Sequence, residues 1–276
     1  MIEKSNKALL FLYHTILGRI ILKLLYNKPI SNLAAFFLNL RISKPMINHY
    51  IKKYQIDMNL YKKKTYKSFN DFFKRELKDI KKTKSKDDFI SLCDSKVMVY
   101  KITDDLKLKI KNTTYNLKEL IKESLNNEYK NGICIIYRLE PKDYHHYIFN
   151  DEGEVLSNKK IDGKLHTVNP IVYDSYQVFT ENKREVTVLK TKNFDEIIQI
   201  EVGALCVGRI NNYSVKEFKR YDEKGFFEFG GSTIIQLLKE NKVEIDQEIL
   251  NNSMEEIETQ VFIGDRIGNK IKKEKK

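Results

Sequence analysis

The sequence contains no tryptophan and only three cysteines and four prolines among its 276 residues. The cysteines, Cys93, Cys134 and Cys206, include no Cys-x-x-Cys pair, and an odd number of thiols cannot all pair within one chain. This scarcity excludes a disulfide-based scaffold and favours a reducing, cytoplasmic setting. No cleavable signal peptide is evident, because the early apolar run ends without a small-residue cleavage site.

The sequence also lacks an uninterrupted hydrophobic run long enough to cross a bilayer. Its most apolar stretch, residues 8–25, is broken by Arg19 and Lys23, which leaves it short of the roughly 20 apolar residues that a spanning helix needs. The apolar residues of this stretch recur at helical spacing: Leu9, Leu12, Ile16, Ile20 and Leu24. We predict a helix that lies in the lipid interface, and an ordinary buried helical hairpin is the alternative.

Acidic residues are scarce in the first third of the chain. Residues 1–86 hold 20 Lys and Arg against 5 Asp and Glu, a balance of +15, whereas the remainder is near neutral at −3. A concentrated basic segment favours a polyanionic partner, either an anionic membrane or a nucleic acid. Nucleic-acid binding is the weaker interpretation, because the aromatic residues of this segment cluster with aliphatic residues as helix faces.

The N-terminal part of the chain reads as helical. After residues 8–25, a second helix is predicted over residues 30–40, with Ser31 as its N-cap. Further helix is predicted over residues 46–80, where Ser68 has the residue type of an N-cap.

A Lys-rich linker at residues 81–88 divides a basic, helical, membrane-associating segment, residues 1–86, from a β-rich body, residues 87–276. In the body, short runs of branched and aromatic residues are separated by turn residues, which predicts strands. These runs are residues 97–102, 133–139, 185–189, 196–202, 204–210, 226–229 and 233–238, and one helix is expected near residues 116–125. We predict an α+β fold in which N-terminal helices precede a mostly antiparallel body, a sandwich or flattened barrel.

A Gly-Gly-Ser-Thr tetrapeptide stands between two of these predicted strands. A glycine carbonyl is open to attack because no Cβ shields it, and Ser232 follows Gly231 directly. The same tetrapeptide also suits a hairpin turn, which is the simpler interpretation when it is taken alone.

Two adjacent histidines follow the predicted strand at residues 133–139. His145 and His146 would point to opposite sides of an extended chain and so make a poor metal pair, and no other His or Cys lies at zinc-ligand spacing. A general base is the stronger functional interpretation, and a hydrogen-bonded structural histidine is the alternative. Asp94, just ahead of another predicted strand, has the chemistry to orient an imidazole.

Taken together and in this order, these elements resemble the phosphatidylserine decarboxylase family, and the resemblance covers nearly the whole chain. The matching segments are SFNDFFKREL (68–77), the turn around Asp94, DYH (143–145), GKLHTVNP (163–170), EVGALCVGRI (201–210) and DEKGFFEFGGST (222–233). Six ordered segments make a specific match.

The resemblance implies that the chain cuts its own backbone. In that family a Gly-Ser bond is cleaved, which here is the bond between Gly231 and Ser232. Ser232 Oγ would attack the Gly231 carbonyl to give an ester, and elimination and hydrolysis would leave a pyruvoyl group and ammonia. The products would be a large chain, residues 1–231, and a small chain, residues 232–276, which stay associated.

A serine hydroxyl needs a base, and the resemblance implies a histidine oriented by a carboxylate. His145 and Asp94 are the candidates, and His146 and His166 are secondary ones. Many family members carry a second histidine three residues after the first, where this sequence has Ile148, so the choice between His145 and His146 stays open.

The pyruvoyl group at Ser232 is the implied cofactor, covalent and self-generated. It forms a Schiff base with the serine amine of phosphatidylserine and accepts the electrons left when CO2 departs, giving phosphatidylethanolamine. The implied enzyme is a carboxy-lyase without a metal, peripheral on the cytoplasmic face of a bacterial membrane and bound to anionic lipid. The resemblance allows a homodimer and implies no nucleic-acid partner.

Two alternatives remain within this fold. One is a lipid-binding relative that does not process itself, against which the intact Gly-Gly-Ser-Thr segment argues. The other is a pyruvoyl decarboxylase of a soluble amino acid, which would leave the apolar N-terminal stretch unexplained.

Overall fold

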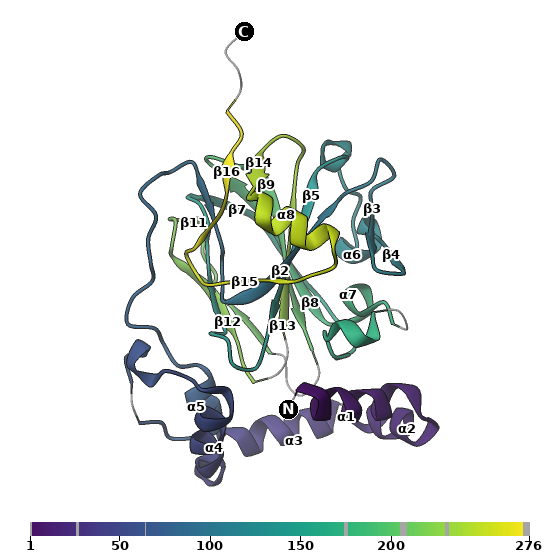
Figure 1. The fold of residues 1–276 in the computed structure, drawn as a ribbon, viewed down its shortest axis with the longest axis vertical. Helices are drawn as coiled ribbons and strands as arrows, with labels where there is room; N and C mark the ends of the chain where they lie inside the picture. The colour runs from purple at the N-terminus through teal and green to yellow at the C-terminus, as the bar shows by residue number, and fades with distance from the viewer. Residues whose placement is uncertain are drawn as a thin grey trace.

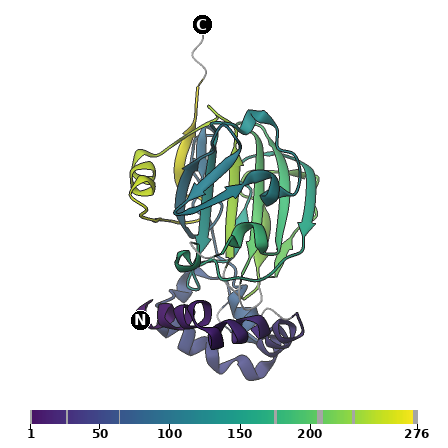
Figure 2. The same cartoon turned by 90° about the vertical axis from the view of Figure 1, so that its right-hand side faces the viewer.

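The computed structural model describes residues 2–25, 28–63, 65–173, 176–204, 209–229 and 232–272. Figure 1 shows a β-rich body with a layer of helices along its lower end, and Figure 2 shows the same two layers from the side. We call residues 2–73 the helical segment and residues 87–272 the β body. The predicted α+β class and the mostly antiparallel pairing are confirmed.

The helical segment consists of α-helices and two short 3-10 turns. In chain order these are α1 (Ile2–His14), α2 (Ile16–Leu25), α3 (Lys28–Asn39), η1 (Arg41–Ser43), α4 (Pro45–Tyr54), η2 (Met58–Leu60) and α5 (Phe69–Phe73). Among the residues described, no helix combines the length and the apolar character needed to span a bilayer.

The predicted helix at residues 8–25 is two helices. Thr15 separates α1 from α2: its hydroxyl donates to the Phe11 carbonyl at 2.8 Å and accepts from the Gly18 amide at 2.9 Å. Gly18 lies so close to α1 that a Cβ would stand 2.0 Å from the Phe11 carbonyl oxygen. The apolar face is split as a result, since Leu9 packs partly buried against the β body whereas Ile16 is exposed.

Two other helix predictions need correction. Helix α3 begins at Lys28, so the predicted cap Ser31 lies inside the helix. The helix predicted over residues 46–80 breaks up after Tyr54, because backbone bonds from Lys62 to the Glu76 carbonyl and from Lys78 to the Leu60 carbonyl fold the chain back on itself. The predicted cap Ser68 is confirmed, since its hydroxyl accepts from the Asp71 amide at the start of α5.

The β body contains all the strands found in the described residues, together with three short helices. Its strands are β1 (Asp88–Ile90), β2 (Ser95–Lys101), β3 (Lys107–Ile110), β4 (Thr113–Asn116), β5 (Ile133–Leu139), β6 (His146–Ile148), β7 (Gly153–Ile161), β8 (Arg184–Thr191), β9 (Asp195–Gly203), β10 (Ile210–Asn212), β11 (Glu217–Phe218), β12 (Glu223–Phe227), β13 (Ser232–Leu238), β14 (Val243–Ile245), β15 (Thr259–Val261) and β16 (Arg266–Lys270). Its helices are α6 (Leu117–Ile121), α7 (Val178–Glu181) and α8 (Gln247–Met254), with turns η3 (Asn127–Tyr129) and η4 (Pro170–Val172).

One eight-stranded antiparallel sheet organises the body, in the order β11-β7-β8-β9-β13-β5-β2-β15. Two three-stranded sheets, β10-β12-β6 and β1-β16-β14, share an apolar core with one of its faces. The other face packs against the β3-β4 pair, α6, α7 and residues of α1 and α2. Strand β13 lies in the middle, bonded along its length to β9 and to β5.

Most predicted strands are confirmed. The strand at residues 133–139 is found with the predicted bounds as β5, and β2, β8, β9 and β13 match within a few residues. The strand predicted over residues 226–229 instead covers Glu223–Phe227. The strand predicted at residues 204–210 falls largely on residues that the structure leaves undescribed, as does Cys206. Cys93 and Cys134 are free thiols in the core.

Candidate active site

Ser232 is the first residue of β13 and is completely buried. It pairs with Leu139 at the end of β5 on one side and with Gly203 at the end of β9 on the other. Its hydroxyl has no hydrogen-bond partner among the residues that the structure describes. A buried hydroxyl without a partner is unfavourable, so its retention in the core points to a reactive group. Gly231, the other predicted cleavage residue, lies outside the described residues.

His145 is also completely buried and holds an unpartnered nitrogen. Its Nδ1 lies 2.9 Å from the carbonyl oxygen of Asp143, whereas its Nε2 has no hydrogen-bond partner in the described part of the chain. Because a carbonyl only accepts, Nδ1 carries the proton and Nε2 presents a lone pair. Burial lowers the pKa of His145 to about 3, and the neighbouring Arg75 and His146 act in the same direction. The ring is therefore neutral at physiological pH, with Nε2 unprotonated.

The fold brings the chain around Ser232 close to His145. The Phe227 amide donates to the His145 carbonyl at 2.9 Å, and Phe229 packs edge-on against Phe73, whose ring centroid lies 4.2 Å from that of His145. Only three Cα steps separate Phe229 from Ser232, which limits their distance to about 11 Å.

Asp94 contacts the backbone beside His145, not its ring. One carboxylate oxygen accepts from the Ile263 amide at 2.8 Å and the other from the Tyr144 amide at 3.4 Å. Burial raises the pKa of Asp94 above its usual range. Asp94 thus accepts a hydrogen bond from the backbone of Tyr144, the residue before His145. The His145 imidazole itself is hydrogen-bonded to the Asp143 carbonyl.

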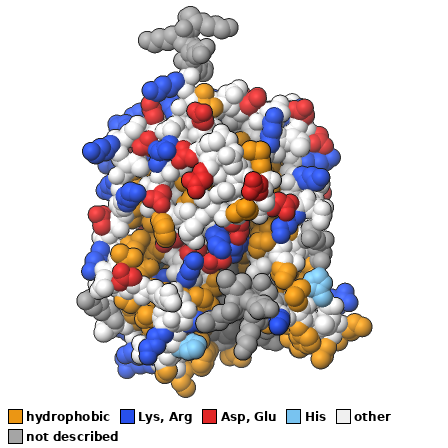
Figure 3. All heavy atoms as spheres, viewed as in Figure 1, with side chains coloured by type: hydrophobic (Ala, Val, Ile, Leu, Met, Phe, Trp, Pro, Cys, Tyr) orange, Lys and Arg blue, Asp and Glu red, His pale blue; other side chains and the backbone are white. Residues whose placement is uncertain are grey.

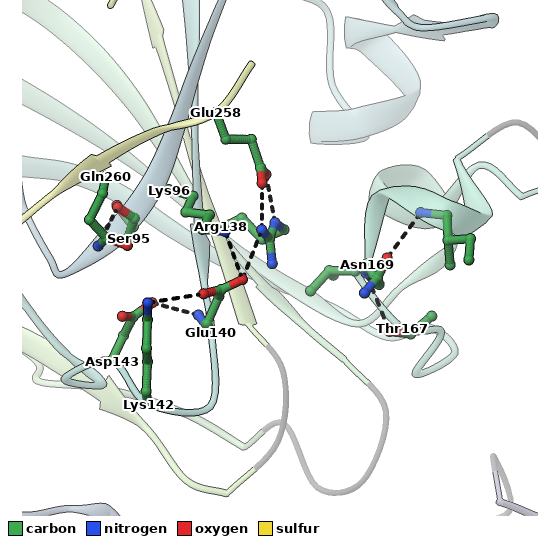
Figure 4. A network of polar contacts seen from close by, with 12 residues as sticks. Ser95, Lys96, Arg138, Glu140, Lys142, Asp143, Thr167, Asn169, Glu258 and Gln260 are labelled. Carbon is green, nitrogen blue, oxygen red and sulfur yellow. Dashed lines mark hydrogen bonds and ion pairs between the residues drawn. The ribbon is translucent and has the colours of Figure 1, made fainter. Parts of the chain in front are cut away.

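The loop between β5 and His145 is held by charged groups at its start. Figure 4 shows Arg138 joined to both Glu258 and Glu140, with Lys96 beside them. The Glu140 amide donates to the Asp143 carboxylate at 2.6 Å. Burial raises the pKa of Asp143 to about 7, and the nearby Asp94 and Glu140 carboxylates contribute to that rise.

His146 occupies a different environment from its neighbour. Its ring stacks on Tyr144 at 4.8 Å and on Phe226 at 5.1 Å between centroids. Both of its nitrogens have partners, since Nδ1 lies 2.7 Å from Glu223 Oε1 and Nε2 lies 3.3 Å from the Lys74 carbonyl. The structure therefore distinguishes the two histidines that the sequence left as alternatives, because only His145 has an unpartnered nitrogen.

His166 is buried as well. Its Nε2 lies 3.3 Å from Glu181, and burial lowers its pKa. The Asn182 amide group joins the carbonyl of His166 to that of Gly203, the strand neighbour of Ser232. His166 thus borders the site through backbone bonds.

Sequence reasoning missed two groups of buried charge. Glu201 and Lys224 form an ion pair at 2.8 Å, and their side chains are 0% and 2% exposed. Glu201 lies opposite Ile234 of β13, and Ile234 points to the same face of the sheet as Ser232. Arg75 is also buried and donates to the carbonyls of Lys142 and Asp143. Neither appears as a charge cluster in the sequence. Among the described residues, no group of three or more His, Cys, Asp or Glu is placed to hold a metal ion.

The sequence model of the phosphatidylserine decarboxylase family matches residues 69–269, which include Ser232, His145 and Asp94. The chain belongs to the phosphatidylserine decarboxylase family. It is 51% identical over 270 residues to phosphatidylserine decarboxylase proenzyme 2 of Clostridium acetobutylicum, covering 96% of this chain and 93% of that protein. It is 40% identical over 277 residues to the phosphatidylserine decarboxylase proenzyme of Clostridium beijerinckii, covering 97% and 94%. The proenzyme of Clostridium tetani is 43% identical over 240 residues, covering 84% and 81%.

Membership of the phosphatidylserine decarboxylase family confirms the resemblance drawn from the six segments. The family match begins at Phe69, the first residue of α5, and so includes part of the helical segment with the whole strand core.

Proposed function

We propose that this chain is a self-processing phosphatidylserine decarboxylase that forms its own pyruvoyl group at Ser232. The observation that carries the proposal is the pair of buried, unpartnered atoms Ser232 Oγ and His145 Nε2, in a chain of this family. A nucleophile and a base are the two groups that backbone cleavage requires.

In the proposed cleavage, Ser232 Oγ attacks the carbonyl carbon of Gly231 while His145 Nε2 takes the hydroxyl proton. The C–N bond breaks, which leaves an ester to Ser232 Oγ and a free amine on Ser232. Loss of the Ser232 Cα proton then expels the Gly231 carboxylate, and the dehydroalanine that remains takes up one water and releases ammonia. Asp94 supports this step through the backbone of Tyr144, which it holds at 3.4 Å.

The residues around Ser232 fit a pyruvoyl group. Ser232 is fully buried at the start of a strand, and its side-chain oxygen has no competing partner. Such a group supplies a ketone that binds the substrate amine and takes up the electrons released when the carboxylate leaves as CO2. His145, neutral and beside the site, is the residue we assign to hold and return protons there.

The two products of cleavage are expected to stay together. Strand β13, which begins the small chain, pairs along seven residues with β9 and along seven with β5, both in the large chain. The small chain also contributes β14, α8, β15 and β16 to the body. Separation would expose these backbone groups and the core beneath them.

The helical segment provides the proposed membrane contact. Eleven of the eighteen large apolar side chains that are exposed among the described residues lie between residues 10 and 46, and Figure 3 shows apolar side chains gathered at this end. Ile16 is 76% exposed, Leu33 67% and Ile42 69%. An apolar surface next to a strongly basic sequence suits the interface of an anionic membrane. We place the enzyme there as a peripheral protein, on the cytoplasmic face.

Intact-mass spectrometry of the purified protein, followed by incubation with phosphatidylserine vesicles, tests the proposal. We expect two chains of 231 and 45 residues, the smaller without an N-terminal amine, and release of CO2 from the vesicles. A folded protein that stays as one chain of 32.7 kDa and still binds the vesicles would instead identify a lipid-binding relative that has lost processing.

A further inference from the structure

Arg75 is a buried cation that the proposed chemistry does not yet use. It follows α5, its side chain is 1% exposed, and its guanidinium carbon lies 4.7 Å from the ring centroid of Tyr61 and 5.1 Å from that of Phe72. Within the described ranges, its Nε and Nη1 atoms have no hydrogen-bond partner. Burying a guanidinium without a bonded carboxylate is costly, so stability alone does not account for this position.

The hydrogen bonds of Arg75 converge on the loop that leads to His145. Its Nη2 donates to the Lys142 carbonyl at 3.0 Å and to the Asp143 carbonyl at 3.1 Å. The carbonyl before them, that of Pro141, accepts from the Tyr50 hydroxyl at 2.6 Å. Three successive carbonyls of this loop are therefore held by Tyr50 of the helical segment and by Arg75, two residues after its end.

The Asp143 carbonyl is shared between Arg75 and His145. It accepts from Arg75 Nη2 at 3.1 Å and from His145 Nδ1 at 2.9 Å. The second ring nitrogen is thereby left without its proton, because in a neutral imidazole only one nitrogen carries hydrogen. A carbonyl fixed in position by a cation selects the tautomer in which Nε2 is the base.

We propose that Arg75 is a positioning residue for His145: by holding the Asp143 carbonyl in place, it keeps His145 in the Nδ1–H tautomer with Nε2 free to accept a proton. This role rests on the proposed function of His145 as the base of cleavage. It also joins that base to the helical segment, because Phe73, two residues before Arg75, packs on the same imidazole.

The test uses the full chain in two forms. Cleavage is timed by pulse-labelled translation and gel electrophoresis for the wild-type chain, Arg75→Met and Arg75→Lys. The tautomer is read from ring-nitrogen NMR signals of 15N-histidine-labelled protein in the uncleavable Ser232→Ala background, with His145→Gln used to assign the signals. The NMR arm does not depend on whether the chain cleaves itself.

Arg220→Met is the matched control. Arg220 donates to the Ser85 carbonyl at 2.9 Å and to the Asp88 carbonyl, and packs on the Tyr221 ring at 5.5 Å. It therefore makes the same kinds of contact as Arg75, but at a loop that does not carry His145.

We expect Arg75→Met to lengthen the cleavage half-time by about 10- to 100-fold, the usual weight of a hydrogen bond from a charged group. In the NMR arm it should produce a second His145 signal set with Nε2 protonated. Arg75→Lys, which keeps one donor, should lie between Arg75→Met and wild type, and Arg220→Met should change neither readout. If Arg75→Met does not fold cooperatively, the cleavage half-time and the His145 tautomer of Arg75→Lys decide the test.

Wild-type cleavage in Arg75→Met, or an unchanged single Nδ1–H tautomer, would overturn the role of Arg75. Equal effects of Arg75→Met and Arg220→Met would show that both residues only stabilise the structure. That result would also overturn the positioning role of Arg75. Absence of cleavage in the wild-type chain would contradict the proposed function, while the tautomer signals would still decide the positioning by Arg75.

Discussion

The β body and the helical segment depart in opposite ways from the rule that polar groups are exposed and apolar groups are buried. The body buries polar atoms that have no partner, Ser232 Oγ and His145 Nε2. The helical segment exposes apolar side chains that nothing covers in the monomer, such as Ile16 and Ile42. Each departure costs stability and so indicates a missing partner. We propose that in the body this partner is a reacting bond, and that on the helices it is a lipid surface.

If this comparison is correct, the two regions can be disabled separately. The largest effect is expected for Ser232→Ala, which removes the attacking oxygen. Cleavage and decarboxylation should both disappear, leaving one chain of 276 residues on a denaturing gel, while binding to anionic vesicles is unchanged. Normal two-chain processing in this variant would exclude the proposed mechanism.

The two adjacent histidines sharpen the comparison within the body. His145→Ala should slow cleavage by at least about 100-fold, the contribution expected of a general base. His146→Ala should slow it by less than about 10-fold, because both His146 nitrogens are already engaged with Glu223 and Lys74 and the loss is one of packing. Gel-based cleavage times of both variants provide the measurement, and the reverse order would make His146 the base.

On the helical segment, Ile16→Ser with Ile20→Ser should weaken vesicle binding without changing cleavage. These residues are four apart on α2, and each is more than half exposed, so the fold should tolerate the change. Each side chain contributes about 1.5–3 kcal/mol when fully buried in lipid, which predicts a loss of at least about tenfold in co-sedimentation with anionic vesicles. Met254→Ser is the control, since Met254 is 74% exposed on α8 of the body. An equal loss with Met254→Ser would assign the membrane contact elsewhere.

The last prediction concerns stability and the carboxyl group of Asp143, in the loop that leads to His145. Its pKa is raised from 3.8 to about 7, so the folded state binds its proton more tightly than the unfolded chain does. The associated stability is present below about pH 4 and is lost as the pH rises to 7, by up to about 4 kcal/mol. In the Ser232→Ala background, Asp143→Asn should therefore gain stability relative to its parent between pH 5 and pH 8. Urea unfolding at the two pH values measures this, and parallel pH dependences in both proteins would argue against the raised pKa.

The sequence was sufficient where local pattern and burial agree. Strand β5 was predicted residue for residue, because a run of branched residues stands between turn residues. The N-cap Ser68 was predicted because its bond to the Asp71 amide is local. Strand β7 was missed because it lies near the sheet edge and is largely polar and half exposed, and α8 because its Asn-rich sequence resembles a loop.

Other features depend on tertiary contacts that no local pattern reveals. The break between α1 and α2 follows from the close approach of Gly18 to Phe11. For the site, the family resemblance supplied Ser232, His145 and Asp94 as candidates, but not which histidine has a free nitrogen. Nothing in the local sequence marks Arg75 as buried, whereas in the structure α5 ends at Phe73 and the Arg75 side chain that follows is 1% exposed.

The position of β13 in the middle of the sheet affects how the protein refolds after denaturation. Before the proposed cleavage, unfolding and refolding involve one molecule, and the sheet can form again at any dilution. If the chain is cut before Ser232 as proposed, the middle strand belongs to a second polypeptide, so refolding becomes a bimolecular reaction whose rate depends on concentration. On this proposal the sheet assembles before the cut, and the two-chain protein preserves a fold that its separated pieces would recover only slowly.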